Sequence, residues 1–197
     1  MNKIRKAQVK RKTRETDISV SLNLDGTGKA KINTPFPFLN HMLELVARHG
    51  LMDLSIIAKG DIEVDAHHTI EDLGIVLGQA IGKALGKKEG IVRYGFARIP
   101  MDEACAEVSL DLGGRPFLLY TVRTTQRKIQ NFDISLVEDF FRATADHARL
   151  SLHIAALYGR NPHHILEAVF KAFARALREA VKRDPRVKGV PSSKGKL

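Results

Sequence analysis

HHTIEDLGIVLGQAIGKALG, residues 67–86, is matched almost a hundred residues later by HHILEAVFKAFARALREA, residues 163–180. Both stretches open with two histidines followed three residues later by a glutamate, and both keep their apolar residues at a helical period. On a helix, the first histidine and the glutamate are i,i+4 neighbours and the second histidine is i,i+3, so the three side chains share one side. Imidazole nitrogens and a carboxylate suit a divalent ion such as Mn, Fe or Zn. The alternative is two ordinary helix starts, where an acid complements the dipole and the histidines are incidental.

The residues around the first stretch predict strands and one further helix. Alternating apolar residues at 18–24 indicate a strand, and residues 25–28 read DGTG, which is typical of a hairpin turn leading to a second strand through 30–32. A helix is expected near 38–48, after two prolines, and a third strand near 51–57. The helix of residues 67–85 follows and ends at Gly86.

The same order begins again after Gly90, with strands in AEVSLDLGG and PFLLYTVRT, a helix near 135–150, the strand LSLHIAALYG, and the second HHxxE helix. Each half therefore reads ββαβα, with the helices on one face of a sheet, and a unit this small buries its core best against another. We predict an α+β fold of two packed repeats. Residues 1–92 form the first, with a basic N-terminal arm, and residues 93–197 form the second, with a C-terminal substrate-binding tail.

Composition narrows the class of protein. The 197 residues are 44% hydrophobic and include a single cysteine, Cys105, which fits a globular protein of the reducing cytoplasm. Neither a secretory signal nor an 18-residue apolar run is present, so we expect no membrane association. The net charge of +10 admits a nucleic-acid-binding module, but aromatic residues make up only 6% of the chain and the known RNA- and DNA-binding patterns are missing. We therefore expect no nucleic-acid partner.

Further donors are expected on the helix that precedes each HHxxE stretch. His41 and His49 lie two turns apart in the first half, and by element order Asp139 answers to His41 in the second. His147 is expected to face solvent, and His153, which alternates within an apolar strand, is expected to be a core or rim residue rather than a ligand.

Several long motifs resemble the imidazoleglycerol-phosphate dehydratase family of histidine biosynthesis across almost the whole chain. They are FLNHMLELVARHG, DAHHTIEDLGIVLGQAIGKALG, GIVRYG, LDLGGRPF, LHIAALYGRNPHHILEAVFKAFARALREA and DPRVKGVPSSKG, together with RETDI near the start. The resemblance implies loss of water from imidazole glycerol phosphate to give imidazole acetol phosphate. It also implies two Mn(II) ions per subunit, where a metal-stabilised imidazolate expels the hydroxyl group and a glutamate moves the protons.

The resemblance also implies a set of site residues. The metal ligands carried over are His41, His67, His68, Glu71, Asp139, His163, His164 and Glu167. Asp139 departs from the family pattern, because EDFF stands where relatives carry a histidine in a segment like EHFF. Its shorter reach and its negative charge put the geometry of that site in question.

Catalysis is assigned to carboxylates, with Glu15 as the proton shuttle beside Glu71 and Glu167. Residues carried over as substrate contacts, mostly on the phosphate side, are His41, His49, Arg93, Arg115, Lys171, Ser192, Ser193 and Lys194. The resemblance further implies a homo-oligomer of 24 subunits built from trimers, acting on a small phosphate-bearing substrate. Another metal-dependent hydrolase or isomerase, or a basic nucleic-acid-binding module, remains as the alternative function.

Overall fold

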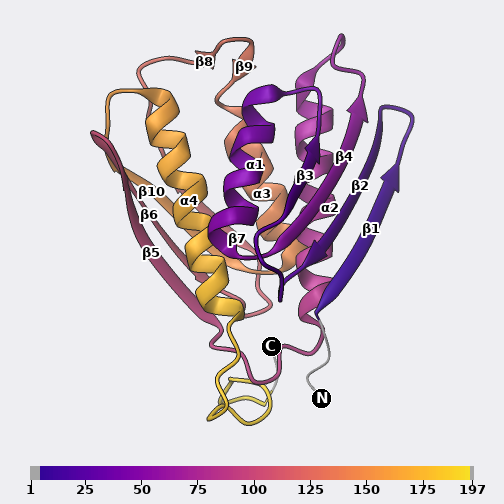
Figure 1. Cartoon of the computed structure of the whole chain (residues 1–197), viewed down its shortest axis with the longest axis vertical. Helices are drawn as coiled ribbons and strands as arrows, with labels where there is room; N and C mark the ends of the chain where they lie inside the picture. The colour runs from indigo at the N-terminus through magenta and orange to yellow at the C-terminus, as the bar shows by residue number, and fades with distance from the viewer. Residues whose placement is uncertain (1–4, 196–197) are drawn as a thin grey trace.

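In the computed structural model, which describes residues 5–195, four helices lie between two four-stranded sheets (Figure 1). The first half holds β1 (Lys6–Lys12), β2 (Thr16–Asn23), β3 (Ala30–Asn33), α1 (Pro37–Gly50), β4 (Asp53–Gly60) and α2 (Ala66–Leu85). The second half holds β5 (Tyr94–Met101), β6 (Ala104–Asp111), β7 (Phe117–Thr121), α3 (Leu136–Ala148), β10 (Ser151–Tyr158) and α4 (Pro162–Val181). A short ladder of β8 (Lys128–Ile129) and β9 (Phe132–Asp133) is inserted between β7 and α3.

The two sheets have the same topology, which confirms the duplicated α+β fold. Their strand orders are β1-β2-β4-β3 and β5-β6-β10-β7. The last pair in each sheet is parallel and the other pairs are antiparallel. Each sheet therefore draws its strands from one half of the chain, whereas the boundary at residue 92 itself remains a prediction.

The predicted hairpin at residues 25–28 is wrong. Strand β4 lies between β2 and β3, and β3 pairs parallel with β4 instead of antiparallel with β2. The cause is Asp53 at the start of β4, whose Oδ1 accepts hydrogen bonds from the backbone N–H of Thr27 at 2.9 Å and of Lys29 at 3.1 Å. These bonds carry the chain past the beginning of β4, so the glycines serve a longer loop.

The predicted N-terminal arm is also wrong for the residues that the structure describes. Residues Lys6–Lys12 form the edge strand β1, with Ala7 buried and the lysines facing outward. The short alternation of small apolar and basic residues hid this strand, and lysines are common on exposed sheet edges. Strand β5 was missed in the same way, so each repeat is βββαβα. Residues 1–4 of the predicted arm lie outside the described residues.

Helices α2 and α3 approach one another more closely than α1 and α4 do. Two glycines on one side of α2 allow this contact, because a Cβ on Gly74 would lie 2.5 Å from the carbonyl oxygen of Phe140, and one on Gly78 would lie 2.7 Å from that of Thr144. Aligning the two HHxxE motifs places Phe170 and Ala174 of α4 at these positions. The two helix pairs have therefore diverged since duplication, and the α1/α4 pair is the more open.

The core fills the space between each sheet and its helices. Four phenylalanines of α3 and α4, at positions 140, 141, 170 and 173, are almost fully buried, and their ring centroids lie 5.0–6.0 Å apart. Burying one such side chain stabilises the fold by roughly 1.5–3 kcal/mol. Cys105 is buried, as expected. No helix within residues 5–195 combines the length and the apolar character needed to cross a membrane.

Candidate active site

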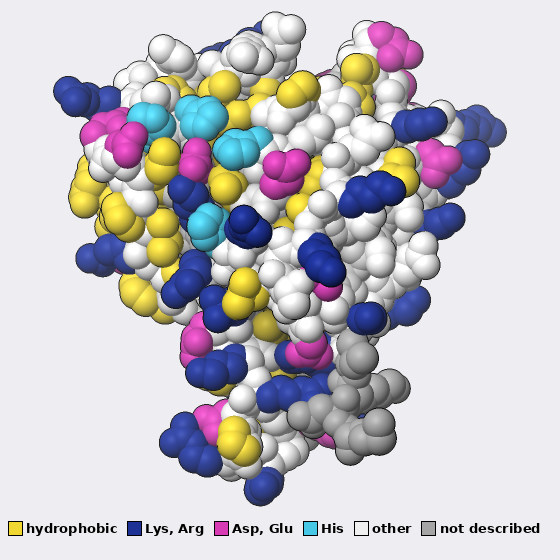
Figure 2. Space-filling model, viewed as in Figure 1, with side chains coloured by type: hydrophobic (Ala, Val, Ile, Leu, Met, Phe, Trp, Pro, Cys, Tyr) yellow, Lys and Arg dark blue, Asp and Glu magenta, His cyan; other side chains and the backbone are white. Residues whose placement is uncertain are grey.

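The two HHxxE motifs open helices α2 and α4, as predicted. The Asp65 carboxylate caps α2 by accepting the backbone N–H of His67 at 2.9 Å, and the Asn161 side chain caps α4 by accepting that of His163 at 2.9 Å. The histidine pairs therefore occupy the first turn of each helix. In the space-filling view several imidazoles gather toward one end of the molecule (Figure 2).

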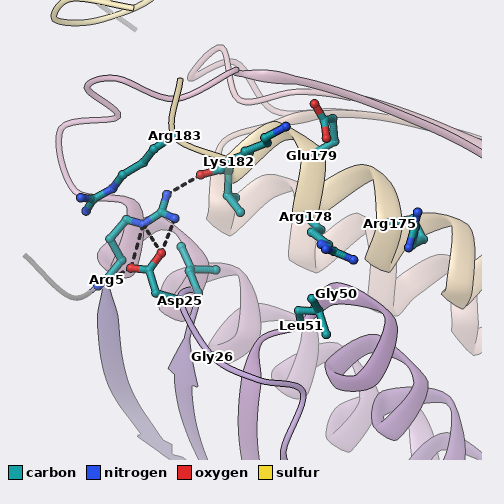
Figure 3. A pocket seen from close by; sticks show the side chains of 12 residues that line it. Arg5, Asp25, Gly26, Gly50, Leu51, Arg175, Arg178, Glu179, Lys182 and Arg183 are labelled. Atoms are coloured by element: carbon teal, nitrogen blue, oxygen red, sulfur yellow. Dashed lines mark hydrogen bonds and ion pairs between the residues drawn. The ribbon is translucent and has the colours of Figure 1, made fainter. Parts of the chain in front are cut away.

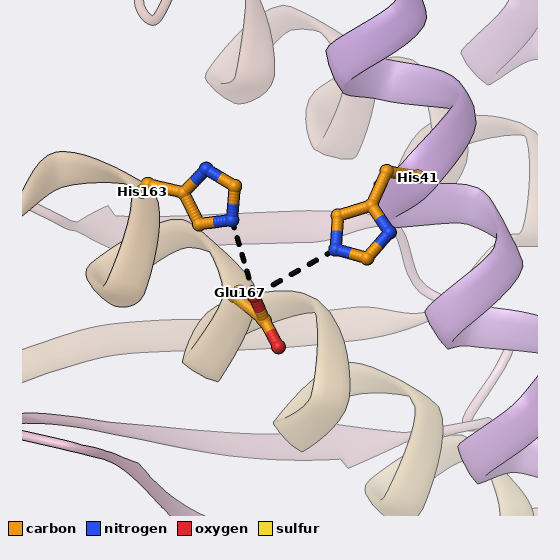
Figure 4. A group of neighbouring side chains, drawn as sticks. All are labelled: His41, His163 and Glu167. Carbon is orange, nitrogen blue, oxygen red and sulfur yellow. Dashed lines mark hydrogen bonds and ion pairs between the residues drawn. The ribbon is translucent and has the colours of Figure 1, made fainter.

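The first group of ligand atoms lies between α1 and α4 (Figure 4). Glu167 Oε2 lies 3.2 Å from His163 Nε2 and 3.7 Å from His41 Nε2. One ligand atom from each of these residues falls within 4.8 Å of the others, so all three could bind the same ion. We call His41, His163 and Glu167 the α1/α4 half-site.

Glu167 is the most enclosed member of this half-site, with 8% of its surface exposed. Burial by itself would raise the pKa of its carboxyl group. The Lys171 ammonium, 2.6 Å from Glu167 Oε1, together with the two histidines, outweighs that effect and leaves the pKa lowered. The carboxylate is therefore held ionised and ready to bind a cation.

A second group lies between α2 and α3. His67 Nδ1 is 3.2 Å from Asp139 Oδ2, and His67 Nε2 is 3.7 Å from Glu71 Oε2. The carboxylates of Asp139 and Glu71 therefore lie on opposite sides of the His67 ring, each next to a different ring nitrogen. The three groups do not surround a common point, as those of the first group do. We call His67, Glu71 and Asp139 the α2/α3 half-site.

Each half-site combines the two repeats. His41 comes from the first repeat but lies beside the ligands of the second, and Asp139 comes from the second but lies beside those of the first. The sequence grouped His41 with His67, His68 and Glu71 by their order in the chain. The helix pairs α1/α4 and α2/α3 determine the spatial grouping instead.

The second histidine of each pair points to a different carboxylate. His68 Nδ1 lies 3.3 Å from both Asp61 oxygens and 4.0 Å from Glu15 Oε2. His164 Nδ1 lies 2.7 Å from Glu103 Oε2. These contacts raise the pKa of both histidines, and the hydrogen bond from His164 lowers the pKa of Glu103 to about 2.

Asp61 and Glu103 were missed from the sequence. Glu15 lies in the turn between β1 and β2, and Glu103 lies in the corresponding turn between β5 and β6. Glu103 is thus the counterpart of Glu15 in the second repeat. Recognising β1 and β5 as strands would have aligned the two turns and identified Glu103.

The remaining histidines lie outside both half-sites. His49 is partly buried, and its pKa is lowered by desolvation and by the charges of Lys171 and Arg175. His147 is exposed, as expected. His153 is exposed on the outer face of the second sheet, with its ring centroid 5.7 Å from that of Phe117, so it is neither a core residue nor near the ligands.

The expected phosphate contacts are divided between the two ends of the molecule. Lys171 pairs with Glu167 beside the α1/α4 half-site, whereas Arg93 donates to Asp111 at 2.7 Å and to the carbonyl oxygen of Pro191 at 2.8 Å. Arg93 N–H also bonds to the carbonyl oxygen of Ala180, near the C-terminal end of α4. Ser192, Ser193 and Lys194 follow that end of the helix, and Arg115 precedes β7. Because a 20-residue helix is about 30 Å long, these residues lie far from His163 in one chain.

The duplicated α+β fold, with histidines and carboxylates gathered at the N-termini of its helices, indicates an enzyme that uses imidazole and carboxylate groups. Comparison with known proteins identifies one enzyme family. The family model for imidazoleglycerol-phosphate dehydratase matches residues 34–177. The enzyme of that name from Acetivibrio thermocellus is 56% identical over 193 residues, covering 98% of this chain and 99% of the relative. The corresponding enzyme from Geobacter metallireducens is 54% identical with the same coverage.

Solved structures of two members of this family have the same fold. The imidazoleglycerol-phosphate dehydratase of Staphylococcus aureus superposes with a TM-score of 0.83 at 42% identity, covering 91% of this chain and 99% of that one. The enzyme from Pyrococcus furiosus gives a TM-score of 0.83 at 38% identity, covering 96% and 100%. The chain belongs to the imidazoleglycerol-phosphate dehydratase family. It is a hydro-lyase of histidine biosynthesis that converts imidazole glycerol phosphate to imidazole acetol phosphate and water.

Proposed function

We propose that dehydration takes place at the two half-sites, each holding one divalent metal ion, with Mn(II) as the resident metal. The observation that carries this proposal is the convergence of His41, His163 and Glu167, whose ligand atoms lie within 4.8 Å of one another. Two imidazoles and an ionised carboxylate fit a borderline-to-hard divalent ion. When bound, such an ion would supply positive charge at a ring nitrogen of the substrate and so favour the electron-rich ring that expels the hydroxyl group.

Asp139 fits the same chemistry less directly. Its carboxylate already lies 3.2 Å from His67 Nδ1, so it would either bind the ion itself or orient the His67 ring from behind. The negative charge of this aspartate makes the α2/α3 half-site more acidic than the α1/α4 half-site. We propose that Asp139 is a ligand, and that this half-site is the more tolerant of harder ions.

Proton transfer is assigned to Glu15. The reaction takes a hydrogen from a carbinol carbon and releases a hydroxyl group, so one carboxylate that accepts the first proton and returns it to the leaving oxygen balances the step as one molecule of water. Glu15 has 55% of its side chain exposed and stands 4.0 Å from His68, beside the ligand-bearing helix. A metal-binding carboxylate such as Glu71 or Glu167 would have to leave its ion to do the same work.

The complete active site is shared between subunits in this proposal. Two histidines of the HHxxE motifs, His68 and His164, point away from the half-sites toward Asp61 and Glu103. The expected phosphate contacts Arg93, Arg115 and residues 192–194 lie at the opposite end of α4 from the metal ligands. Both observations are explained if a neighbouring copy supplies the missing imidazole to each ion and the arginines to the substrate phosphate. The 24-subunit particle built from trimers is the arrangement that the family resemblance implies.

The outer surfaces of the two sheets support such an assembly. The outer face of the second sheet exposes the large apolar side chains Tyr94, Phe96, Phe117 and Leu119. The corresponding face of the first sheet carries mostly lysines and serines at 6, 10, 12, 19, 21, 31, 55 and 59. An apolar sheet face of this size is expected to be covered by another copy, whereas the lysine-rich face suits solvent.

A cytoplasmic location, suggested by the single buried cysteine and by biosynthetic function, belongs to the same proposal.

The test uses purified protein stripped of metal with a strong chelator. Sedimentation of the stripped protein should show smaller particles, and addition of Mn(II) should restore both the large particle and the formation of ketone without release of free phosphate. A verified metal-free protein that keeps its full size would contradict shared coordination. Full turnover by that protein would contradict the metal assignment itself.

A further inference from the structure

A cavity of about 470 Å³ lies at the C-terminal ends of α1 and α4, and none of its lining residues belongs to either half-site (Figure 3). Arg175 and Arg178 of α4 form one side and Gly50 and Leu51 at the end of α1 form the other. Arg5 closes one end. None of the phosphate contacts implied by the family lines this cavity.

The charge around this cavity is unbalanced. Five of its lining side chains are cationic and two are acidic, a net charge of +3. One acidic group is already neutralised, because Asp25 Oδ1 lies 2.6 Å from Arg5 Nη2 and both Asp25 oxygens lie 3.2 Å from Arg5 Nε. Glu179 is then the one remaining carboxylate, and Figure 3 shows it turned away from the side on which Arg175 and Arg178 extend.

Arg175 and Arg178 have unused hydrogen-bonding capacity. Neither guanidinium makes a hydrogen bond or an ion pair with another residue in the range 5–195, and both side chains are exposed. A guanidinium presents five N–H donors in a rigid fork, so two of them on one wall of a cavity leave many donors directed at the same space.

The duplication provides an internal comparison. Aligning the HHxxE motifs places Gln79 at the position of Arg175 and Gly82 at that of Arg178, and both line the corresponding cavity between α2 and α3. The fold therefore does not require arginine at either position. Three of the cations in that cavity bond to backbone carbonyl oxygens: Lys83 to Gln8 at 3.3 Å, Lys88 to Leu112 at 2.9 Å and Arg149 to Gly114 at 3.1 Å. Those three cations bind the neighbouring backbone, whereas Arg175 and Arg178 make no such bond.

We propose that Arg175 and Arg178 form a second anion site, which lies outside the two half-sites and binds the phosphate group of a small phosphate monoester. Paired guanidinium groups match the several oxygens of a phosphate dianion, and the cavity volume lies within the range of small-ligand pockets. The chemistry is the same whether the phosphate belongs to the enzyme's own imidazole-bearing substrate and product or to an unrelated monoester. Binding here is independent of the metal assignment made above.

The test is equilibrium dialysis of labelled inorganic phosphate against the metal-loaded, assembled enzyme. Wild-type protein is expected to bind in two classes of site per chain. In R175Q/R178Q, the second class of site is expected to bind phosphate at least tenfold more weakly and so to drop out of the measured range. The reason is that the variant loses the charge-assisted hydrogen bonds that hold the phosphate. The matched control is K10Q/K83Q, which removes two charges from the α2/α3 cavity and should retain both classes. Thermal unfolding at an unchanged midpoint shows that the variants remain folded.

Competition then distinguishes the sources of phosphate. Displacement from this site by imidazole acetol phosphate but not by glycerol 3-phosphate assigns it to the reaction's own metabolites, and equal displacement assigns it to phosphate monoesters in general. Retention of both classes of site in R175Q/R178Q overturns the proposal. Loss of both classes overturns the separateness of the two sites, and loss of one class in K10Q/K83Q places the second site in the wrong cavity.

Discussion

His41 Nε2 lies 3.7 Å from Glu167 Oε2, although His41 belongs to the first repeat and Glu167 to the second. The α1/α4 half-site therefore exists only where the repeats meet, and its geometry depends on how two helices from different halves of the chain pack. Changes to the ligands and changes to the helix contacts should thus be separable by experiment.

His163→Ala removes one of the three ligands of the α1/α4 half-site. Metal content measured by elemental analysis should fall by about half, because the other half-site keeps its own ligands. His147→Ala is the matched control, since His147 is exposed and lies outside both half-sites. If His163→Ala retained full metal content, the half-site would be a structural contact and the metal assignment would fail.

Glu15→Gln keeps the size of the side chain and removes its titratable proton. Turnover should fall by about 10²–10⁴-fold, whereas metal content, assembly and substrate binding should be unchanged. The exposed loop residue Glu89, changed to Gln, provides the control. Turnover close to that of the wild type would move the proton-transfer role to another carboxylate, and Glu103, the counterpart of Glu15, would be the first to examine.

Gly78→Ala should separate α2 from α3. The added Cβ would lie 2.7 Å from the carbonyl oxygen of Thr144 and 2.9 Å from the backbone nitrogen of Ala148, so we expect a loss of about 1–3 kcal/mol in the free energy of unfolding. The α2/α3 half-site should also lose affinity for metal. Gly82→Ala is the control, because its Cβ would meet nothing closer than 3.7 Å. Denaturant titration distinguishes the two variants, and equal stabilities would show that the helices can move apart freely.

Asp53→Ala should destabilise the loop before β3 by about 1–2 kcal/mol, because two backbone N–H groups lose their acceptor. The hydrogen bond from Thr27 lowers the pKa of Asp53 below its ordinary value of 3.8. Its contribution is therefore complete above that pH and is lost as the pH falls through the lowered value. The stability difference from wild type should shrink in acid. Asp17→Ala, which removes an exposed ion pair with Lys12, should change stability by less than about 0.5 kcal/mol.

The sequence was sufficient for the repeat and for its long helices. The HHxxE motifs, the apolar period of α2 and the glycine at its end predicted that helix to within a residue, because each signal is local. The strands β1 and β5 could not be recognised in this way. Their outer residues are basic or aromatic and their inner residues include Ala7 and Gly95, so the alternation of polarity is weak.

The candidate site was predicted as a set of residues but not as an arrangement. Which histidine meets which carboxylate depends on the contacts α1/α4 and α2/α3, and these contacts depend on side-chain volumes on facing helices. The glycines that bring α2 against α3 could be read only as weak points within a helix until Phe140 and Thr144 were placed opposite them. The pairing of His164 with Glu103 required the turn between two strands, one of which had not been identified.

The exchange of His41 and Asp139 between repeats has a consequence for how such a molecule could arise. A protein made of one repeat would contain both kinds of ligand on its own helices, yet it could bring them together only by pairing with a second copy of itself. Joining two copies in one chain replaces that concentration-dependent encounter with a permanent local one. The two binding partners then become free to accumulate different substitutions, because neither has to remain complementary to itself.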